Sequence, residues 1–194
     1  MKIENIELYK SITIETKEIF FDEKKEIIFL GRSNAGKSSL LNILFNKKNF
    51  VKTSSKPGST RTVNLFTVNN KFYYTDLPGY WFAKMWIIAR DKIDALISWY
   101  VEEKKSNIKK AFMIIDSKLW AQKRDLDMYL YLKNLNIPLV VINNKVDKLS
   151  KNEALKSIDS AYQLFFWEKI INFSTITKEW LKELEAVIDE SFKK

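Results

Sequence analysis

The sequence predicts an α/β domain in which helices flank a mixed, mostly parallel six-stranded sheet. Short apolar runs alternate with amphipathic helical patterns, which is the order expected of a sheet covered on both faces. The chain has 194 residues and is 46% hydrophobic, enough for one sizeable core. Its four glycines lie in three loops, whereas average usage would give roughly 14. These loops are therefore candidate functional loops.

The expected elements follow in order along the chain. Residues 26–30 form a buried strand that runs into the first glycine loop, and a helix begins near Lys37. Residues 46–62 are mostly polar and predict a long loop. The runs 63–68 and 71–76 are joined by Asn69 and Asn70, which suit a two-residue hairpin turn. By their apolar spacing, the later elements are a helix within 80–103, a strand at 111–116, a helix at 124–135, a strand at 139–144, a helix from 152, a strand at 170–173 and a last helix near 180–192.

We expect residues 1–20 to be an N-terminal extension and residues 21–194 to be a single domain, because the sequence shows no linker, repeat or low-complexity tract. The N-terminus carries acidic residues and lacks the apolar stretch of a signal peptide. The longest weakly polar run, 134–144, is about half of what a bilayer crossing requires. These features predict a cytoplasmic protein without membrane insertion, and nothing in the sequence demands more than a monomer.

The composition limits the chemistry. The chain has neither cysteine nor histidine, so thiolate metal sites and imidazole catalysis are excluded. Catalysis must use carboxylates, hydroxyls, lysine, backbone dipoles or a hard cation. The net charge of +9 is compatible with an RNA-facing surface. However, only four of the 33 basic residues are arginine, and this skew is equally typical of a genome-wide composition bias.

The first glycine loop fits the Walker A pattern between a strand and a helix. Its candidate phosphate-binding residues are Gly31, Arg32, Ser33, Asn34, Ala35, Gly36, Lys37, Ser38 and Ser39. The glycines let backbone N–H groups converge on a β-phosphate, Lys37 bridges the β- and γ-phosphates, and the Ser38 hydroxyl ligates Mg²⁺. The alternative is a glycine-rich turn that binds nothing. The pattern arises by accident in about one chain in a hundred, so the flanking strand and helix favour the nucleotide site.

A second motif, Asn144, Lys145, Val146 and Asp147, ends a later strand, where ligands gather in open α/β sheets. Guanine presents two adjacent donors, and an ionised Asp147 offers two acceptors in one plane. Adenine would leave that carboxylate unpaired, a mismatch that discriminates strongly. The four-residue pattern is weak alone, but after a phosphate loop it indicates GTP over ATP. Ser174 and Thr175, after the strand that ends at Phe173, can brace the base through backbone donors.

A third motif, Asp76, Leu77, Pro78 and Gly79, ends the second hairpin strand. Asp76 can hold Mg²⁺ through a water, and the Gly79 N–H can approach a γ-phosphate. By itself the motif could be a Pro-Gly turn. In the loop before the hairpin, Thr60 is the candidate second hydroxyl ligand of Mg²⁺. Its neighbours complete the phosphate-binding set, namely Gly58, Ser59, Arg61 and Thr62.

Taken in order, these motifs resemble a translation-factor-class small GTPase of Ras-like fold, and in particular the EngB family, also called YihA or YsxC. The segments that carry the resemblance are 31–39, 53–60 and 76–83, and the similarity spans roughly residues 20–194. It implies GTP and Mg²⁺ binding with Ser38 and Thr60 as metal ligands. It also implies a bacterial-type GTPase that acts with the large ribosomal subunit precursor and its rRNA, and that is needed for normal cell division and septation.

The sequence departs from the family at two places. Trp81 stands where family members commonly have glycine, and the segment from Phe173 to Ile176 matches the base-bracing motif only loosely.

Tyr80 occupies the position at which Ras-type enzymes place the glutamine that orients the attacking water. We therefore expect slow hydrolysis, with Lys37, Thr60 and Gly79 as the catalytic residues and with stimulation by a partner or by K⁺. Asn34 resembles a phosphate-loop asparagine that helps to bind K⁺ in related GTPases, although it could equally be a loop-capping side chain.

Two other classes of protein are alternatives. An ATP-dependent small-molecule kinase would also have a phosphate loop, but the residues 144–147 argue against it. A GTPase domain detached from a tRNA-modifying or membrane-associated relative would normally need a further domain, for which this chain has no room. In the favoured interpretation the nucleotide reorders loops 46–62 and 77–90. The candidate rRNA contacts are the lysines on or near those loops, namely Lys47, Lys48, Lys52, Lys56 and Lys84.

Overall fold

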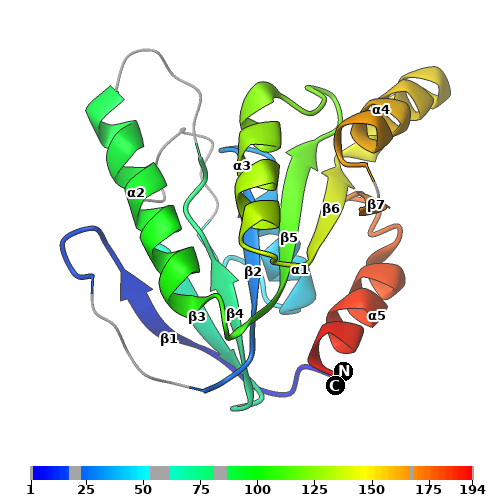
Figure 1. Cartoon of the computed structure of the whole chain (residues 1–194). Coiled ribbons are helices and arrows are strands. Elements are labelled where there is room, and N and C mark those ends of the chain that lie inside the picture. The colour runs from blue at the N-terminus through cyan, green and yellow to red at the C-terminus, as the bar shows by residue number, and fades with distance from the viewer. Residues whose placement is uncertain (1, 18–22, 53–61, 81–86, 167, 194) are drawn as a thin grey trace.

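The computed structural model describes residues 2–17, 23–52, 62–80, 87–166 and 168–193, with the side chains of 87–90 left out. Within these residues one mixed sheet has the strand order β1-β3-β4-β2-β5-β6-β7 (Figure 1). The strands are β1 (Ile6–Ile12), β2 (Glu26–Gly31), β3 (Val63–Val68), β4 (Phe72–Asp76), β5 (Ile108–Asp116), β6 (Leu139–Asn144) and β7 (Lys169–Phe173). The helices are α1 (Lys37–Leu44), α2 (Ile87–Lys104), α3 (Lys123–Asn134), the 3-10 helix η1 (Val146–Lys148), α4 (Lys151–Leu164) and α5 (Leu181–Phe192).

The sheet is mostly parallel. Neighbouring pairs from β4 through β2, β5, β6 and β7 are parallel, while β3 is antiparallel to both β1 and β4. The predicted α/β class and the mixed sheet flanked by helices are confirmed. The predicted count of six strands was one too low, because residues 6–12 of the expected N-terminal extension form β1.

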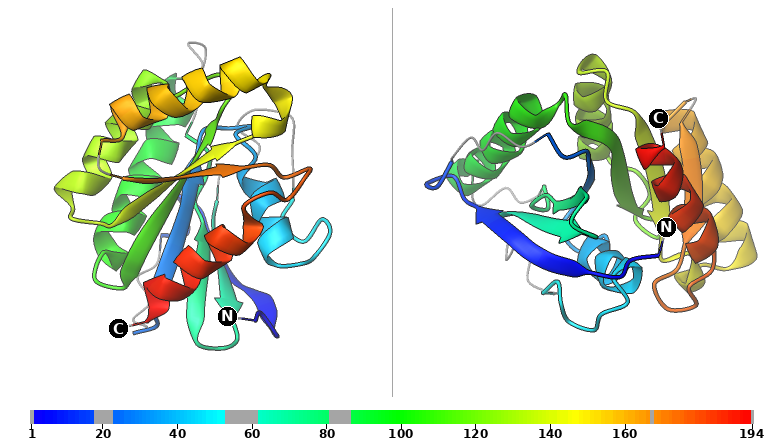
Figure 2. Two further views of the ribbon diagram at one scale, coloured as in Figure 1. Left: turned by 90° about the vertical axis from the view of Figure 1, so that its right-hand side faces the viewer. Right: turned by 90° about the horizontal axis from the view of Figure 1, so that it is seen from below.

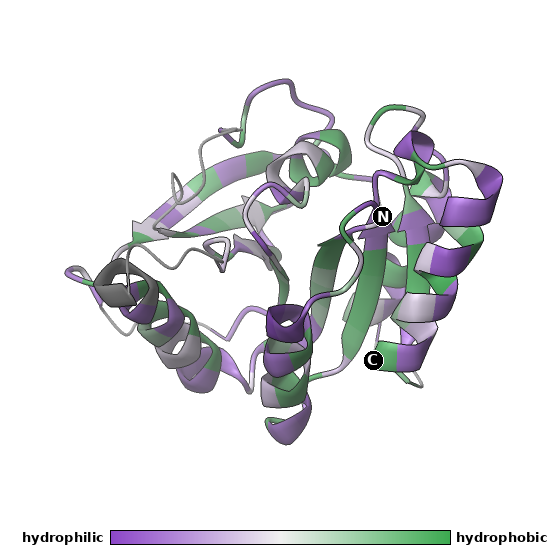
Figure 3. Cartoon of the chain, turned by 90° about the horizontal axis from the view of Figure 1, so that it is seen from above, coloured by the Kyte–Doolittle hydropathy of each residue, from purple (hydrophilic) through white to green (hydrophobic). Residues whose placement is uncertain are grey.

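Two apolar clusters, one on each face of the sheet, form the core. One face is covered by α2 and α3, and the opposite face by α1 and α5 (Figure 2). Every residue of β2 is buried, because this strand has neighbours on both sides and helices on both faces. Figure 3 shows hydrophobic colour in the central strands and hydrophilic colour on the outer faces of the helices. Of the helices in the described part of the chain, none is both long and apolar enough to span a membrane.

Strand β1 reaches both cores because it contains a bulge. Leu8 pairs with Phe66 and Lys10 with Leu65, so Tyr9 is the extra residue. Side chains of a regular strand alternate between faces, and one extra residue exchanges the two faces. Ile6 accordingly packs in the cluster under α1 and α5, whereas Ile12 packs in the cluster under α2 and α3. This interrupted pattern explains why the sequence did not reveal the strand.

The hairpin turn between β3 and β4 binds the residues that precede β1 in the sequence. Asn69 and Asn70 have positive φ of 51° and 54°, as expected, but the paired Val68 and Phe72 are separated by three residues rather than two. The side-chain oxygen of Asn69 accepts hydrogen bonds from the N–H groups of Glu4 and Asn5 at 2.8 and 3.0 Å. The predicted turn is therefore also an anchor for the N-terminal segment.

A carboxyl group is fully buried at the start of β2. Glu26 has no exposed surface. Its Oε2 accepts hydrogen bonds from the hydroxyl of Tyr100 at 2.8 Å and from that of Thr75 at 3.2 Å, while its Oε1 has no hydrogen-bond partner among the described residues. Burial raises the pKa of Glu26 from 4.5 to about 7, although Tyr100, Lys104 and Thr75 oppose the shift.

This raised pKa makes stability depend on pH. Between pH 4.5 and 7 the unfolded chain loses the Glu26 proton while the folded chain keeps it, so the free energy of unfolding falls as pH rises. Relative to Glu26→Gln, the wild type should lose up to about 3 kcal/mol between pH 5 and pH 8. Urea unfolding at several pH values measures this, and Glu7→Gln controls for loss of one carboxylate. If the free energies of unfolding of the wild type and Glu26→Gln differ by the same amount at every pH in this range, the raised pKa of Glu26 is contradicted.

Candidate functional site

The three sequence motifs meet at one edge of the sheet. Strands β2, β4, β5, β6 and β7 all run in the same direction, so their carboxyl ends lie together, as is typical of ligand sites in open α/β sheets. Gly31 ends β2, Asp76 ends β4, Asn144 ends β6 and Phe173 ends β7. The predicted residues 58–61 fall outside the described residues, and Thr62 donates its hydroxyl to Asn64 at 3.2 Å.

The phosphate loop leads into α1 with its amides available. Gly36 precedes the helix at a φ of 99°, a conformation that strongly favours glycine. Among the described residues no side chain caps α1, and its first turn contains no acidic residue. The first N–H groups and the positive end of the helix dipole can therefore receive an anion, as a phosphate-binding helix requires.

The glycines of the motifs are also needed for contacts within the protein. A Cβ on Gly36 would collide with the side-chain amide of Asn144, and one on Gly31 would collide with the carbonyl oxygen of Ile114 on β5. A Cβ on Gly79 would lie 3.0 Å from Ser33 Oγ. The scarce glycines thus allow three close approaches, in addition to offering bare backbone to a phosphate.

Lys37 and Asp76 form a buried ion pair between the first and third motifs. Their side chains are 7% and 1% exposed. Asp76 Oδ2 is buried and has no hydrogen-bond partner among the described residues. A buried carboxylate oxygen beside a lysine suits a Mg²⁺-phosphate group, and the Ser38 hydroxyl follows that lysine directly in the chain. Mg²⁺ prefers oxygen donors, and phosphate prefers cations. The residues present therefore fit the implied metal.

The second motif braces the phosphate loop. Asn144 donates its side-chain amide to the carbonyl of Ala35 at 2.8 Å. Lys145 donates to the carbonyl of Asn34 at 2.6 Å and forms an ion pair with Asp116 at 2.6 Å. These two hydrogen bonds join residues that are 109 and 111 positions apart in the sequence. Asn34 itself is exposed and has a φ of 68°, a conformation that asparagine tolerates well.

Asp147 and Ser174 form the end of the site that was predicted to read a base. The Ser174 hydroxyl donates to Asp147 Oδ1 at 2.6 Å and accepts from the N–H groups of Ile176 and Thr177 at 3.1 and 3.0 Å. Ser174 is buried and Asp147 is exposed, so a fixed hydroxyl orients a carboxylate at the surface. The side chain of Phe173 is buried in the apolar cluster beneath α1 and α5.

Two residues near the phosphates direct their side chains elsewhere. Arg32 donates to the carboxylate of Asp125 on α3, with Nε 2.9 Å from Oδ2, and to the carbonyl of Trp120 at 3.0 Å. The Tyr80 hydroxyl donates to Asp125 Oδ1 at 2.8 Å. Burial, followed by the charge of Asp125, raises the pKa of Tyr80 well above its usual value. Tyr80 is thus held in its neutral form, with its hydroxyl bonded to α3.

Sequence reasoning did not identify Asp125. The pattern from Gln122 to Asp125 marks the start of a helix, and these residues do form a capping box. That role alone predicts an exposed residue, whereas Asp125 is fully buried. Its partners Arg32 and Tyr80 are 93 and 45 positions away, so no local signal pointed to them.

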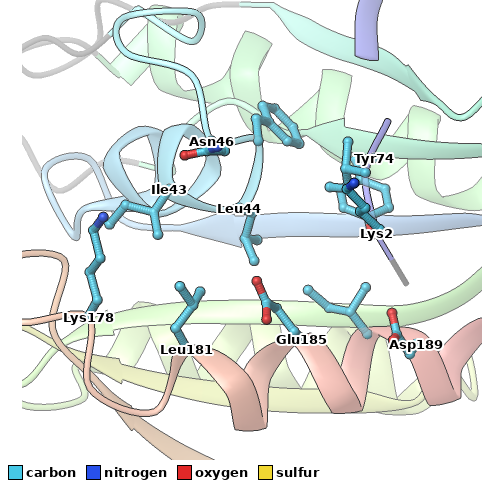
Figure 4. Close-up of a pocket in the computed structure, with 12 residues that line it drawn as sticks. Lys2, Ile43, Leu44, Asn46, Tyr74, Lys178, Leu181, Glu185 and Asp189 are labelled. Atoms are coloured by element: carbon cyan, nitrogen blue, oxygen red, sulfur yellow. The ribbon is translucent and has the colours of Figure 1, made fainter. Parts of the chain in front are cut away.

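A cavity of about 510 Å³ lies apart from the motifs, between α1 and α5. Figure 4 shows Leu181 and Glu185 of α5 pointing toward Leu44 of α1 across it. Its lining also includes Tyr74 of β4 and the N-terminal Lys2. It is therefore formed at the far end of α1 from the phosphate loop.

Comparisons with known proteins agree with this geometry. The family model described as "50S ribosome-binding GTPase" matches residues 26–145. A "Probable GTP-binding protein EngB" of Thermosipho africanus is 38% identical over 191 residues, covering 97% of each chain. The protein of the same name from Kosmotoga olearia is 40% identical over 168 residues, covering 85% of this chain and 87% of the relative.

Solved structures show the same relationship. The crystal structure of a probable GTP-binding protein engB has a TM-score of 0.71 at 29% identity and covers 86% of this chain and 97% of its own. Aquifex aeolicus Era bound to GDP·AlF4⁻ has a TM-score of 0.71 at 25% identity, covering 87% of this chain and 57% of its own. The family model spans more than half of the chain and the EngB relatives span most of it, so the chain is a GTPase of the EngB family.

Proposed function

We propose that this GTPase is a slow molecular switch that acts in the cytoplasm during assembly of the large ribosomal subunit and is required for normal cell division and septation. The observation that carries the nucleotide part is the pair of hydrogen bonds from Asn144 to Ala35 and from Lys145 to Asn34. They join the loop suited to phosphate with the motif suited to guanine. In a single monomeric domain, this link supports one site for one nucleotide.

Guanine is read by Asp147. Its carboxylate accepts from the N1–H and the exocyclic amino group of guanine, and Ser174 holds that carboxylate in orientation. Thr175 and the backbone near Phe173 complete this end of the site. Asn144, Lys145 and Val146 hold Asp147 at a fixed position relative to the phosphate loop. ATP is rejected because adenine would leave an acceptor facing the Asp147 carboxylate.

The phosphates are bound by the backbone of residues 31–39 and by Lys37. Ser38 and Thr60 would hold Mg²⁺ directly and Asp76 would hold it through a water, while Gly58, Ser59, Arg61 and Thr62 would complete the phosphate-binding set. Bound Mg²⁺ neutralises charge on the phosphate oxygens. Lys37 stabilises negative charge on the γ-phosphate, Thr60 helps to position the attacking water, and the Gly79 N–H orients the γ-phosphate. Hydrolysis is slow because Tyr80 stands at the position of the water-orienting glutamine but cannot orient the water. Its hydroxyl is hydrogen-bonded to Asp125 instead.

The base assignment predicts an exchange of specificity. Asp147→Asn should weaken GDP binding by at least about 100-fold and give tight binding of xanthosine diphosphate, because the new amide N–H can donate to the xanthine C2 oxygen. Titration with fluorescent GDP, xanthosine diphosphate and ATP measures this, with Asp159→Asn on α4 as the matched control. ATP binding that ignores the Asp147 substitution would instead support the small-molecule kinase.

K⁺ is the proposed activator of hydrolysis, with Asn34 as a ligand. The exposed, left-handed position of Asn34 in the phosphate loop supports this, because a cation there would supply the charge of an arginine finger. Turnover should be several-fold higher in K⁺ than in Na⁺, and Asn34→Gly, which tolerates the same φ, should abolish the difference. Asn46→Gly is the control, since Asn46 also has a positive φ, of 50°. Equal turnover of the wild type in both salts would refute the idea.

The partner is the large ribosomal subunit precursor through its rRNA. The description of the matching family as ribosome-binding and the net charge of +9 support this. Of the candidate lysines, Lys47, Lys48 and Lys52 are exposed. Lys47 is already engaged, because its ammonium donates to the carbonyl of Ile6 at 3.1 Å and lies 4.5 Å from the ring centre of Phe50. Lys56 and Lys84 fall outside the described residues.

Replacing Lys48 and Lys52 together by glutamine should weaken binding to large-subunit precursor particles. It should also flatten the dependence of log K on log salt concentration by about 1.4 to 1.8, because each lost phosphate contact lowers the slope by roughly 0.7 to 0.9. Sedimentation of the GTP-analogue-bound protein with the particles at several salt concentrations measures this. The double change Lys151→Gln and Lys156→Gln on α4 removes the same charge as a control. An unchanged slope would exclude Lys48 and Lys52 as contacts.

A further inference from the structure

We propose that Asp125 of α3 is a positioning residue for the GTPase reaction, which holds Arg32 of the phosphate loop and Tyr80 beside Gly79 in one buried cluster. Through this cluster Asp125 keeps Gly79 next to the phosphate loop, where its N–H must lie to contact a γ-phosphate. The inference rests on the proposed nucleotide site and adds a residue outside all three motifs. It assigns to α3 the role of distinguishing GTP from GDP.

The carboxylate of Asp125 is saturated by its partners. Oδ1 accepts from the Tyr80 hydroxyl at 2.8 Å and from Arg32 Nε at 3.2 Å. Oδ2 accepts from the N–H of Gln122 at 2.8 Å and lies 2.9 Å from Arg32 Nε. Asp125 is fully buried, and Tyr80 is 2% exposed. Charge-assisted hydrogen bonds of this kind are strong, and loss of one partner would leave a buried charge poorly compensated.

The backbone beside the cluster is joined in the same place. Arg32 and Tyr80 form a parallel bridge, and the N–H of Ser33 donates to the carbonyl of Tyr80 at 3.2 Å. Gly79 lies so close to Ser33 that a Cβ on it would be 3.1 Å from the Ser33 nitrogen. The segment that carries Gly79 therefore lies directly against the phosphate loop, and among the described residues the bridge that joins Tyr80 to this loop is short.

The side-chain cluster strengthens this short bridge. One residue on each side of the bridge, Arg32 and Tyr80, donates to the same carboxylate. Moving the Gly79 segment away from the loop would separate Tyr80 from Asp125, or would pull Asp125 from Arg32. Both movements leave a buried polar group without its hydrogen-bond partner, which costs free energy. Asp125 thus biases Gly79 toward the position that a γ-phosphate uses and GDP does not.

The consequence is a selective effect on the triphosphate state. Asp125→Asn weakens the hold on Arg32, and Tyr80→Phe removes only the buried hydroxyl. Each variant should bind a non-hydrolysable GTP analogue about tenfold more weakly, while GDP affinity stays within about twofold of the wild type. The kcat for GTP hydrolysis should fall. Because both changes remove one shared interaction, the double variant should be little worse than Asp125→Asn alone.

The test titrates the 194-residue chain with fluorescent GDP and with the fluorescent GTP analogue, for the wild type, Asp125→Asn, Tyr80→Phe, the double variant and a control. The control is Asp127→Asn, which removes an exposed carboxylate two positions away on the same helix. Thermal unfolding verifies that each protein is folded. Tyr80→Phe keeps the ring and its packing, so it tests the proposal even if Asp125→Asn does not fold.

Selective loss of GTP-analogue affinity, with Asp127→Asn unchanged, supports the proposal. Equal loss for both nucleotides would overturn it in favour of a purely structural role, and so would unchanged affinities in folded variants. These outcomes leave the proposed GTP-binding function intact, because the wild type still binds guanine nucleotides. A wild type that binds neither nucleotide would overturn the function and this inference together.

Discussion

The close approach of β6 to the phosphate loop is the constraint on which the site depends. Gly36 must be glycine both for its φ of 99° and because the Asn144 side chain fills the space where a Cβ would lie. The same Asn144 amide donates to Ala35, and Lys145 donates to Asn34. The loop and the end of β6 therefore determine each other's shape. A parallel sheet makes this possible, because it brings the ends of distant strands to one edge.

The two ends of the site are stabilised in different ways. At the phosphate end, buried charged groups pair with each other, as in the Lys37–Asp76 pair and the Arg32–Asp125 pair. At the base end, a buried neutral hydroxyl of Ser174 orients the exposed carboxylate of Asp147. Breaking a buried charge pair is costly, whereas an exposed carboxylate can exchange water for a ligand readily. The geometry thus combines a firmly held phosphate loop with an accessible surface for the base.

The sequence predicted the elements that have strong local signals and missed those defined by distant contacts. The apolar run of β2, the motif at residues 31–38 and the positive-φ pair Asn69–Asn70 are readable locally, and the structure contains each as expected. Strand β1 was missed because the bulge at Tyr9 interrupts its alternation. Asp125 was missed because its burial depends on residues 93 and 45 positions away. The burial of the Phe173 side chain was likewise not predicted, because it depends on the packing of α1 and α5 around the end of β7.

The bulge in β1 has a further consequence for how this strand can vary. Ile6 and Ile12 are anchored in opposite cores, and only the extra residue at position 9 lets one strand serve both. Most side chains between these two isoleucines are exposed, so their chemical identity matters little to the fold. A deletion or insertion of a single residue there would instead turn one isoleucine toward the wrong face. For this edge of the protein, the number of residues between the two anchors is more tightly constrained than their composition.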